Sequence, residues 1–471
     1  MAKPLKVMIA GAGIGGLTLA ILLEKQGVDY EVFEQSTVVR PLGSATGLMP
    51  NVLALFEQIG LLAEIEDISR VGLRMEVFQE SLDRINSVEF EPYKSMQVFP
   101  QSRFWLELQF CGYNTLVTPR PDLHKLLLSH VPAEKIHMGK KIVSIEQNDH
   151  SVTIHTANNH SHTADILIGS DGAYSGVRHS LYKEMKDKGC LPASDDEDLK
   201  ACHMSVLGTT RPLDTTLFPL VKGPYSKGDV IIGSNKPHTW RYFTAKGDRV
   251  CWRVDVQIEV ASVADDMIRS EWGPEPFDTM EHNWRSFKLP IGGTIGDMIE
   301  ATPRESISRV VLEEKLHQTW FHNRTVLIGD ACHKMLPNSG RGGVNAILDA
   351  VVLANAIYEM GDSSSANLQA AFQQYYDERF PLAEADFYAS RQAARLFAGQ
   401  TWKDRALRFV IFNVLPGFTQ RQIYAKSLSY RPQLSYLPQV PKKGDGPLVE
   451  QKKSTRYASE LAKQKDDVAA Q

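Results

Sequence analysis

The residues best placed for chemistry near the start of the chain are three glycines of GAGIGG: Gly11, Gly13 and Gly16. Glycine at the first position permits a tight turn, and the second glycine lets the backbone approach a pyrophosphate. The third lets a helix pack closely on a strand. Glu34 follows 18 residues after Gly16, where a carboxylate can accept hydrogen bonds from a ribose hydroxyl pair. The spacing therefore predicts a dinucleotide site.

The elements around this motif decide how it is interpreted. Residues 5–10 form a short apolar run typical of a buried strand, residues 17–26 have the pattern of a helix, and residues 30–33 that of a second strand. In this strand–turn–helix–strand order, a glycine-rich turn indicates a nucleotide site, because the helix N-terminus offers N–H groups to phosphates. An ordinary turn without a ligand is the alternative.

Two further predicted strands end in an aspartate. Residues 164–169 (ADILIG) lead to Asp171, and residues 325–328 (TVLI) lead to Asp330. Ligands of open α/β sheets bind at such strand ends, where an aspartate can bind a polyol hydroxyl. After Asp330 comes the loop PNSGRGG, and its exposed backbone at the start of an apolar-faced helix can stabilise negative charge on a ring. The glycines of this loop are Gly340, Gly342 and Gly343.

Composition and charge limit the classes of partner. Lys and Arg total 52 against 56 Asp and Glu, so the balance favours neither nucleic acid nor an anionic membrane. Five scattered cysteines without a CxxC motif are typical of reduced intracellular thiols. A strand that begins by residue 5 leaves no room for a signal peptide, and no apolar run is long enough for an integral span.

These features predict an intracellular protein that is cytoplasmic or peripherally associated with a membrane. The best membrane candidate, residues 406–418 (ALRFVIFNVLPGF), is short and contains Arg408, which favours a core or interfacial helix. The sequence leaves the oligomeric state open.

Two clusters of side chains favour a structural interpretation. The first is a group of four histidines: His150, His155, His160 and His162. They fall on two predicted turns and the strand between them, without one shared face, so hairpin positions are favoured over a metal site. The second is aromatic, and it is expected to fill the core behind a pocket: Phe104, Trp105, Phe110 and Tyr113. No GxSxG or HExxH motif supports a hydrolase.

Taken together, GxGxxG with a distal glutamate, DGxxSxVR and GDAxHxxxPxxGxG resemble the motifs of class A flavoprotein monooxygenases, the FAD-binding 3 family. The matches cover residues 7 to about 355. The resemblance implies an α/β fold like that of para-hydroxybenzoate hydroxylase. A Rossmann-type FAD-binding domain (glutathione-reductase-like) is then interleaved with a mixed β-sheet substrate domain, and C-terminal helices follow. The extension with SLSYRPQLSYLP is most similar to fungal monooxygenases of the paxilline-epoxidase type.

The resemblance and the predicted elements together give domain boundaries. The FAD-binding domain is expected to comprise residues 1–75, 119–190 and 301–365, and the β-rich substrate domain residues 76–118 and 191–300. A helical extension is expected over 366–441. The polar segment 442–471 has too few apolar residues to pack and is predicted to be disordered.

The resemblance also implies roles for individual residues. Glu34 would bind the adenosine ribose, Arg120 the pyrophosphate region and Asp330 the ribityl chain. Gly47 would line the flavin, and Gly343 would face the isoalloxazine. The full set expected to bind FAD is Gly11, Gly13, Gly16, Glu34, Arg40, Gly47, Arg120, Asp171, Asp330, Gly340, Gly342 and Gly343. Arg341 departs from the family, which usually has a smaller residue there.

The implied reaction uses FAD, with NAD(P)H and O2 as co-substrates. NAD(P)H would reduce the flavin, and a C4a-hydroperoxide would transfer one oxygen atom to a small molecule. Tyr225 is the closest positional match to the family's catalytic tyrosine. An ordinary turn tyrosine is the alternative, and Tyr242 would then compete as a pocket residue. A lipophilic aromatic or isoprenoid secondary metabolite suits the aromatic-rich β region, with hydroxylation and epoxidation both open.

Three alternatives keep the fold but change the activity. They are a flavin-dependent dehydrogenase or oxidase, a halogenase, and a non-enzymatic FAD-fold binding protein. The halogenase signature WxWxIP is absent from the sequence.

Overall fold

The computed structural model describes residues 5–89, 111–234, 238–257, 284–399, 401–414, 422 and 424–469. Its first sheet has the strand order β17-β18-β11-β1-β2-β7. The bounds are β1 (Lys6–Ala10), β2 (Asp29–Phe33), β7 (Ile136–His137), β11 (Ile166–Gly169), β17 (Phe321–His322) and β18 (Thr325–Leu327). Strands β18, β11, β1 and β2 are parallel, so their carboxyl ends share one edge of the sheet. The glycine turn, Asp171 and Asp330 therefore meet at that edge.

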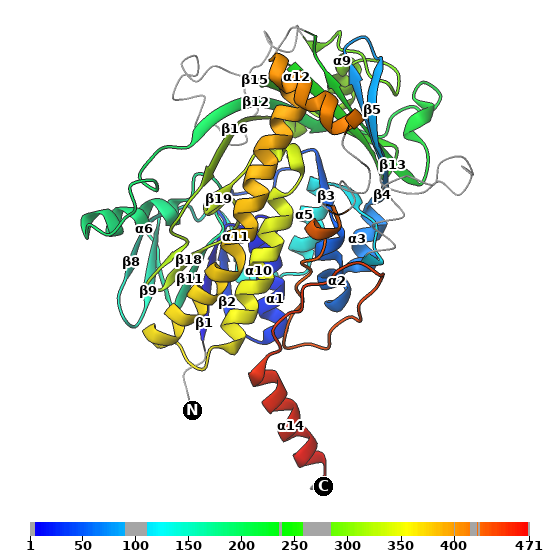
Figure 1. Cartoon of the computed structure of the whole chain (residues 1–471). Helices are drawn as coiled ribbons and strands as arrows, with labels where there is room; N and C mark the ends of the chain where they lie inside the picture. The colour runs from blue at the N-terminus through cyan, green and yellow to red at the C-terminus, as the bar shows by residue number, and fades with distance from the viewer. Residues whose placement is uncertain are drawn as a thin grey trace.

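Three helices pack in sequence beside this sheet (Figure 1). They are α1 (Ile14–Gln26), α10 (Gly342–Glu359) and α11 (Ser365–Ala398). A Cβ on Gly15 would lie 3.1 Å from Cβ of Ala346, so α1 and α10 approach closely. The other helices of this half are α2 (Pro50–Gln58), α3 (Leu62–Ile68), α5 (Arg120–Ser129) and α6 (Gly176–Asp187).

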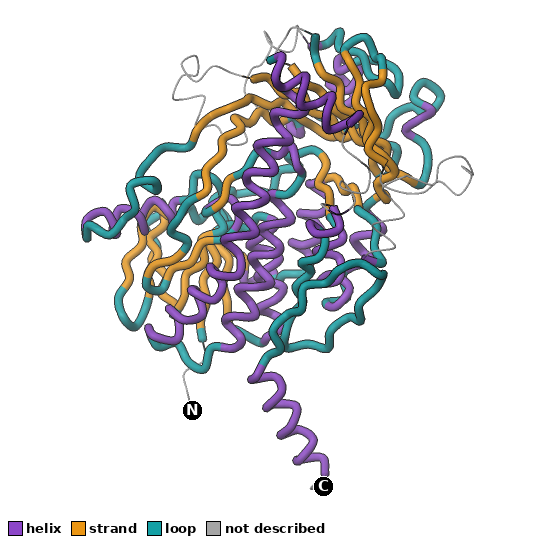
Figure 2. The backbone as a smooth tube through the Cα atoms, viewed as in Figure 1, coloured by secondary structure: helices purple, strands orange, loops and turns teal. Residues whose placement is uncertain are grey.

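The second sheet arches over the upper end of these helices (Figure 2). Its order is β19-β16-β12-β15-β14-β13-β4-β6-β3, with β5 paired to β4. The bounds are β3 (Ala45–Leu48), β4 (Arg70–Gln79), β5 (Arg84–Glu89), β6 (Leu116–Pro119), β12 (Lys200–Thr209), β13 (Tyr225–Ile232), β14 (His238–Ala245), β15 (Arg249–Gln257), β16 (Ser308–Leu316) and β19 (His333–Lys334). One face buries Trp240 and Trp252 against α9 (Ile295–Ala301), and the other packs against Phe397 of α11.

A small antiparallel sheet contains β8 (Ile142–Gln147), β9 (Val152–Thr156) and β10 (Ser161–Ala164). Of the four histidines in this region, His155 forms a hydrogen bond between its Nδ1 and Ser161 Oγ at 2.8 Å. The ring of His162 packs edge-on against Phe33, with the ring centroids 4.7 Å apart. The short helices are η1 (Ala133–Lys135), η2 (Pro219–Val221), η4 (Arg304–Ser306), η5 (Gly329–Ala331) and η6 (Pro337–Ser339). Within the described ranges, no helix combines the length and apolar composition needed to cross a bilayer.

The α/β architecture with two sheets and C-terminal helices agrees with the sequence prediction. Strand pairing nevertheless crosses the expected domain boundaries. Strands β3 and β16 lie in stretches expected to belong to the nucleotide-binding half, yet they pair within the second sheet. Short strands carry no sequence signal for the sheet they join, because pairing depends on partners far along the chain.

The segment 442–471 was expected to be disordered, and the structure differs. It is described as far as 469 and ends in helix α14 (Thr455–Ala469). Lys443 Nζ lies 2.6 Å from Glu57 Oε2, and Arg456 Nη1 donates to the carbonyl of Tyr358 at 2.8 Å. Polar contacts with α2 and α10 thus replace the apolar burial that the composition lacks.

Candidate functional site

A cavity of about 500 Å³ opens at the carboxyl ends of β1, β2 and β11. Its walls are the glycine turn, the segment after β2, the start of α5 and the turn after β11. Six residues predicted from the sequence line it: Gly11, Gly13, Glu34, Arg40, Arg120 and Asp171. The cavity is large enough for part of a dinucleotide.

The glycine turn is shaped by two close contacts and one open position. Gly11 has a φ of +97°, and a Cβ there would lie 2.5 Å from the carbonyl oxygen of Ser170. A Cβ on Gly16 would collide with the carbonyl oxygen of Gly11. Gly13, by contrast, has no heavy atom within 4 Å of its Cβ position and faces the cavity. The backbone at Gly13 is therefore accessible to a ligand at the N-terminus of α1.

Glu34 is held at the cavity wall by backbone donors. Its Oε2 accepts from the N–H of Ala12 at 2.9 Å, and its Oε1 accepts from the N–H of Ser36 at 2.8 Å. His124 Nε2 lies 2.7 Å from the carbonyl oxygen of Ala12, and burial lowers the pKa of this histidine. The sequence reading missed His124, although it lies one helical turn after Arg120, where two side chains share a face.

The cavity has more basic than acidic side chains. Arg40, Arg120, Lys140 and Lys141 line it together with the acids Glu34 and Asp171. This excess of positive charge suits a diphosphate.

Local contacts position Arg120 and Asp171 in the cavity wall. A Cβ on Gly43, whose φ is +124°, would lie 2.9 Å from Cδ of Arg120, so glycine makes room for the arginine. Asp171 accepts from Ser175 Oγ at 2.5 Å and from the N–H of Val177 at 3.2 Å. Burial raises the pKa of Asp171.

Apart from Gly16 in α1, the remaining predicted residues lie beyond the cavity, around the start of α10. A Cβ on Gly343 would lie 3.8 Å from Thr46 Cγ2, next to Gly47 in the chain, and a Cβ on Gly342 would lie 4.0 Å from Asp330 Oδ1. The Cβ position of Gly47 is open, with no heavy atom within 4 Å. The Cβ position of Gly340 lies 4.0 Å from Met49 Cε, just beyond the end of β3.

The two groups of residues lie next to each other. The Cβ position of Gly343 is 3.9 Å from Cδ1 of Ile14, which follows Gly13 at the start of α1. Helix α10 has no acidic residue in its first turn, so no side chain there offsets its positive dipole. The N-terminus of α10, which is suited to an anionic ring, therefore lies beside the glycine turn that lines the cavity.

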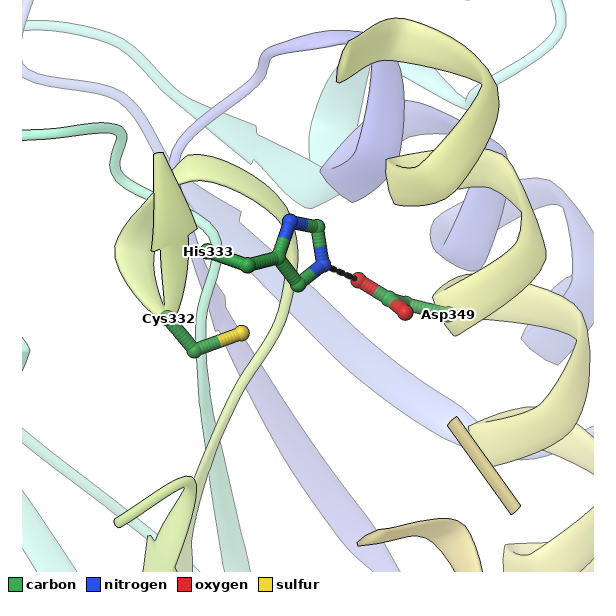
Figure 3. A group of neighbouring side chains, drawn as sticks. All are labelled: Cys332, His333 and Asp349. Atoms are coloured by element: carbon green, nitrogen blue, oxygen red, sulfur yellow. Dashed lines mark hydrogen bonds and ion pairs between the residues drawn. The ribbon is translucent and has the colours of Figure 1, made fainter. Parts of the chain in front are cut away.

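A buried charge network supports the loop that carries Asp330. Asp349 Oδ2 accepts from the N–H of Gly329 at 2.9 Å and lies 2.5 Å from Nε2 of His333 (Figure 3). Its Oδ1 accepts from Nε of Arg379 at 2.8 Å. Burial acts to raise the pKa of Asp349, but the charges of His333 and Arg379 outweigh it and lower the pKa to about 2. The network joins η5, α10 and α11.

Cys332 lies beside this network, so the group resembles a metal site (Figure 3). Asp349 already accepts from Arg379 and a backbone N–H, and burial raises the pKa of the Cys332 thiol well above its usual range. A thiol must lose its proton to bind a metal. Among the described residues, we therefore interpret Cys332, His333 and Asp349 as structural.

Arg341, the departure noted in the glycine loop, is tied to α11. Its Nη1 lies 3.1 Å from Asp386 Oδ1, and Asn345 Nδ2 donates to Asp386 Oδ2 at 2.9 Å. Arg379 Nη2 in turn donates to Oδ1 of Asn345 at 2.7 Å. Arg341 therefore anchors the loop to the same network that holds Asp349.

Tyr225 lies at the start of β13 and is not among the residues that line the cavity. The pairing of β13 with β4 is irregular between Ser226 and Lys227, and beyond this point Ile231 packs in the cluster around α9. Val230 and Ile232 occupy the face that packs on α11. The catalytic role of Tyr225 stays a prediction. Tyr242 is buried, and its hydroxyl donates to Asp229.

A second buried charge cluster lies in the large sheet and was not predicted. Asp255 Oδ2 accepts from Arg241 Nη2 at 3.0 Å and from Arg253 Nη2 at 2.8 Å, and Ser205 donates to Asp255. Burial lowers the pKa of Arg241 to about 10. These contacts connect β12, β14 and β15. Because two guanidinium groups share one carboxylate, this group of three charged side chains carries more positive than negative charge.

Of the aromatic residues singled out in the sequence, Phe104, Trp105 and Phe110 lie outside the described residues. Tyr113 donates to Glu57 Oε2 at 2.6 Å, away from the cavity.

Comparison with known proteins identifies the family. The family model described as "FAD binding domain" matches residues 4–212 and 259–387. The chain is 27% identical over 459 residues to the FAD-dependent monooxygenase ausM of Emericella nidulans, covering 94% of this chain and 89% of ausM. It is 27% identical over 467 residues to the FAD-dependent monooxygenase atmM of Aspergillus flavus, covering 96% and 91%.

Solved structures share the fold. Klebsiella pneumoniae HpxO, complexed with FAD and uric acid, aligns with a TM-score of 0.70 at 20% identity, covering 91% of this chain and 97% of HpxO. CtdE, in complex with FAD and a substrate, gives a TM-score of 0.66 at 17% identity, covering 85% and 92%. The chain belongs to the FAD-binding 3 family of flavoprotein monooxygenases and is an FAD-dependent monooxygenase.

Proposed function

We propose that this monooxygenase takes electrons from NAD(P)H and transfers one atom of O2 to a lipophilic aromatic or isoprenoid secondary metabolite. Bound FAD supplies the hydride acceptance and oxygen activation that protein side chains cannot. The names of the curated relatives support this activity, since ausM and atmM are FAD-dependent monooxygenases. Hydroxylation and epoxidation are both consistent with it.

The observation that carries the proposal is the cavity at Glu34, with the N-terminus of α10 next to its glycine turn. Glu34 would hold the adenosine ribose, and Arg40 and Arg120 would neutralise the pyrophosphate beside Gly13. The open Cβ positions of Gly13 and Gly47 leave room for a ligand to contact the backbone. The residues present therefore fit the cofactor.

The residues around the flavin ring would stabilise charge and position the ring. Asp330, paired with Lys334 at 2.6 Å, would bind the ribityl chain. The N-terminus of α10, at Gly342 and Gly343, would stabilise the negative charge of the reduced ring. Asp171 would support the turn beside the pyrophosphate.

The test is a screen of lipophilic aromatic and isoprenoid compounds for faster NAD(P)H oxidation by the purified, yellow protein. A compound that passes is then turned over under ¹⁸O2, and the product mass is measured. One labelled oxygen atom per product is the expected result. Product without label would instead identify an oxidase, if hydrogen peroxide forms stoichiometrically, or a dehydrogenase, if it does not. A matched reaction in H2¹⁸O with ordinary O2 must leave the product unlabelled.

A further inference from the structure

Helix α12 (Trp402–Phe409) has its polar and apolar faces reversed. Helices on globular proteins normally turn their apolar stripe toward the core. In α12 the buried side chains are Asp404 and Arg408, while Trp402 is 75% exposed and Phe409 is 62% exposed. The apolar face of this helix therefore points away from the protein.

Specific polar contacts fix this orientation. Asp404 completes a capping box with Thr401 and accepts from Arg395 Nη2 at 3.1 Å. Arg408 donates from Nε to the carbonyl of Leu396 and from Nη2 to the carbonyl of Gly399, both at 2.8 Å. Rotating the helix to bury Trp402 would break these bonds and leave charges unpaired.

The exposed apolar surface continues into the next turn, η7 (Val410–Val414). Leu407 is 38% exposed, Val410 46% and Val414 59%. Five large apolar side chains are thus exposed between 402 and 414. Exposed apolar side chains gathered on one short segment are typical of an interaction site.

We propose that α12 and η7 form an anchor that lies in the surface of a lipid bilayer. Tryptophan is favoured at such surfaces, and amphipathic helices bury their apolar face in the headgroup region. The exposed charged residues of α12, Lys403 and Arg405, are both basic, which is complementary to anionic headgroups. With eight residues in α12 and five in η7, the segment is too short to span a bilayer.

The position of the anchor brings the bilayer to the end of the molecule that carries the second sheet (Figure 1). Helix α11 leads directly into α12, and Phe397 near its end packs on that sheet. The carbonyl of Phe397 also accepts from Thr239 Oγ1 of β14 at 3.3 Å. Helix α12 is therefore connected to the second sheet through the end of α11.

The test measures co-sedimentation of the full-length, FAD-loaded protein with vesicles. We expect binding to an equal mixture of phosphatidylcholine and phosphatidylserine, weaker binding to phosphatidylcholine alone, and less binding as salt rises. The double variant Trp402→Ser/Phe409→Ser should bind about tenfold or more weakly, because it removes two large apolar side chains. The matched control Leu217→Ser/Val449→Ser changes side chains that are 71% and 53% exposed elsewhere, and it should bind like the unmodified protein.

A second measurement does not depend on how the double variant folds. An environment-sensitive dye attached at position 409 of Phe409→Cys/Cys190→Ser should shift to shorter wavelength when mixed vesicles are added, whereas the same dye on exposed Cys190 of the unmodified protein should not. Unmodified protein that stays in the supernatant with both vesicle types would overturn the proposal. So would self-association without lipid that the double variant abolishes, because the patch would then be an interface between two copies. Both measurements report binding, so they are independent of oxygen transfer.

Discussion

Glu34 is the cavity residue that would bind the ribose of FAD, and substitution tests this role. The variant Glu34→Ala removes a charged acceptor from the cavity wall. We expect FAD affinity to fall by roughly 1.5–3 kcal/mol, the usual range for hydrogen bonds to a charged group. Isothermal titration of the apoprotein with FAD measures the change.

The control for Glu34 separates binding from local structure, because its carboxylate also holds the backbone of Ala12 and Ser36. Glu34→Gln keeps an acceptor oxygen and should lose less affinity than Glu34→Ala. The melting temperature of each apoprotein reports any structural loss. Unchanged FAD affinity in Glu34→Ala would remove this residue from the site.

The low pKa of Asp349 predicts that the free energy of unfolding depends on pH. Its pKa falls from an ordinary value of 3.8 to about 2 in the folded protein, because His333 and Arg379 outweigh the effect of burial. A depressed pKa in the folded state stabilises the protein above the unfolded pKa, and the contribution is lost as the pH falls through the folded one. We expect the free energy of unfolding to drop by roughly 2 kcal/mol between about pH 4 and pH 2 through this residue.

Asp349→Asn isolates this contribution. It should lower the free energy of unfolding at neutral pH by about 3–5 kcal/mol, because a buried arginine loses its partner. The difference between the two proteins should then shrink on acidification toward pH 2. Urea titrations across this range test both statements, and an undiminished difference at low pH would contradict the assigned role.

At the scale of elements, the sequence predicted what local patterns encode. The apolar run before Gly11 and the helix after it were placed within a few residues of β1 and α1. The apolar spacing of residues 50–62 predicts one helix, whereas the structure has α2 and α3 with Gly60, at a φ of +82°, between them. The network around Asp349 could not be predicted, because its partners come from helices that meet only in the fold.

The turn between β1 and α1 allows an element-scale prediction with a built-in control. Gly16→Ala puts a Cβ against the carbonyl of Gly11, so α1 must move away from the sheet. We expect the apoprotein to lose about 1–3 kcal/mol of stability. Gly13→Ala meets no heavy atom within 4 Å and has an ordinary φ of −76°, yet its methyl group enters the cavity.

Gly16→Ala should therefore lower stability, whereas Gly13→Ala should lower FAD affinity. Gly13→Ala should keep the apoprotein melting temperature within a few degrees and bind FAD at least about tenfold more weakly, since close backbone approach is lost. Denaturant titration and FAD titration on both variants give the comparison. Equal FAD affinity in Gly13→Ala and the unmodified protein would argue against a pyrophosphate at this turn.

For the whole molecule, the sequence predicted two interleaved halves, but it did not predict the contacts of residues 442–471. Composition alone made 442–471 a disordered tail. In the structure, Gln451 donates from Nε2 to the carbonyl of Gln433 at 2.6 Å, and the N–H of Gln433 donates back to Gln451 Oε1 at 2.8 Å. Next to Gln433, Leu434 is fully buried in the main core. Such pairing depends on a partner segment, which residue composition does not encode.

Two truncations distinguish the parts of this segment. A chain that ends at 454 lacks α14, whose Arg456 and Glu460 contact Tyr358 at the surface, and should lose at most about 1 kcal/mol. A chain that ends at 441 also lacks Lys443 and Gln451, and the peptide groups of Gln433 lose both hydrogen bonds to Gln451. We expect this second truncation to lower the free energy of unfolding by about 1–3 kcal/mol.

Flavin content is the control that separates stability from cofactor binding in these truncations. Among the described residues, none after 441 lines the cavity or belongs to the set expected to bind FAD, so both shortened proteins should keep the FAD content of the full chain. Thermal unfolding and the ratio of flavin to protein absorbance measure the two effects on the same samples. If the chain ending at 441 melts like the full-length protein, the contacts of 442–454 contribute nothing to stability. If it loses flavin instead, the segment acts on the cofactor site through α2, which Lys443 reaches at Glu57.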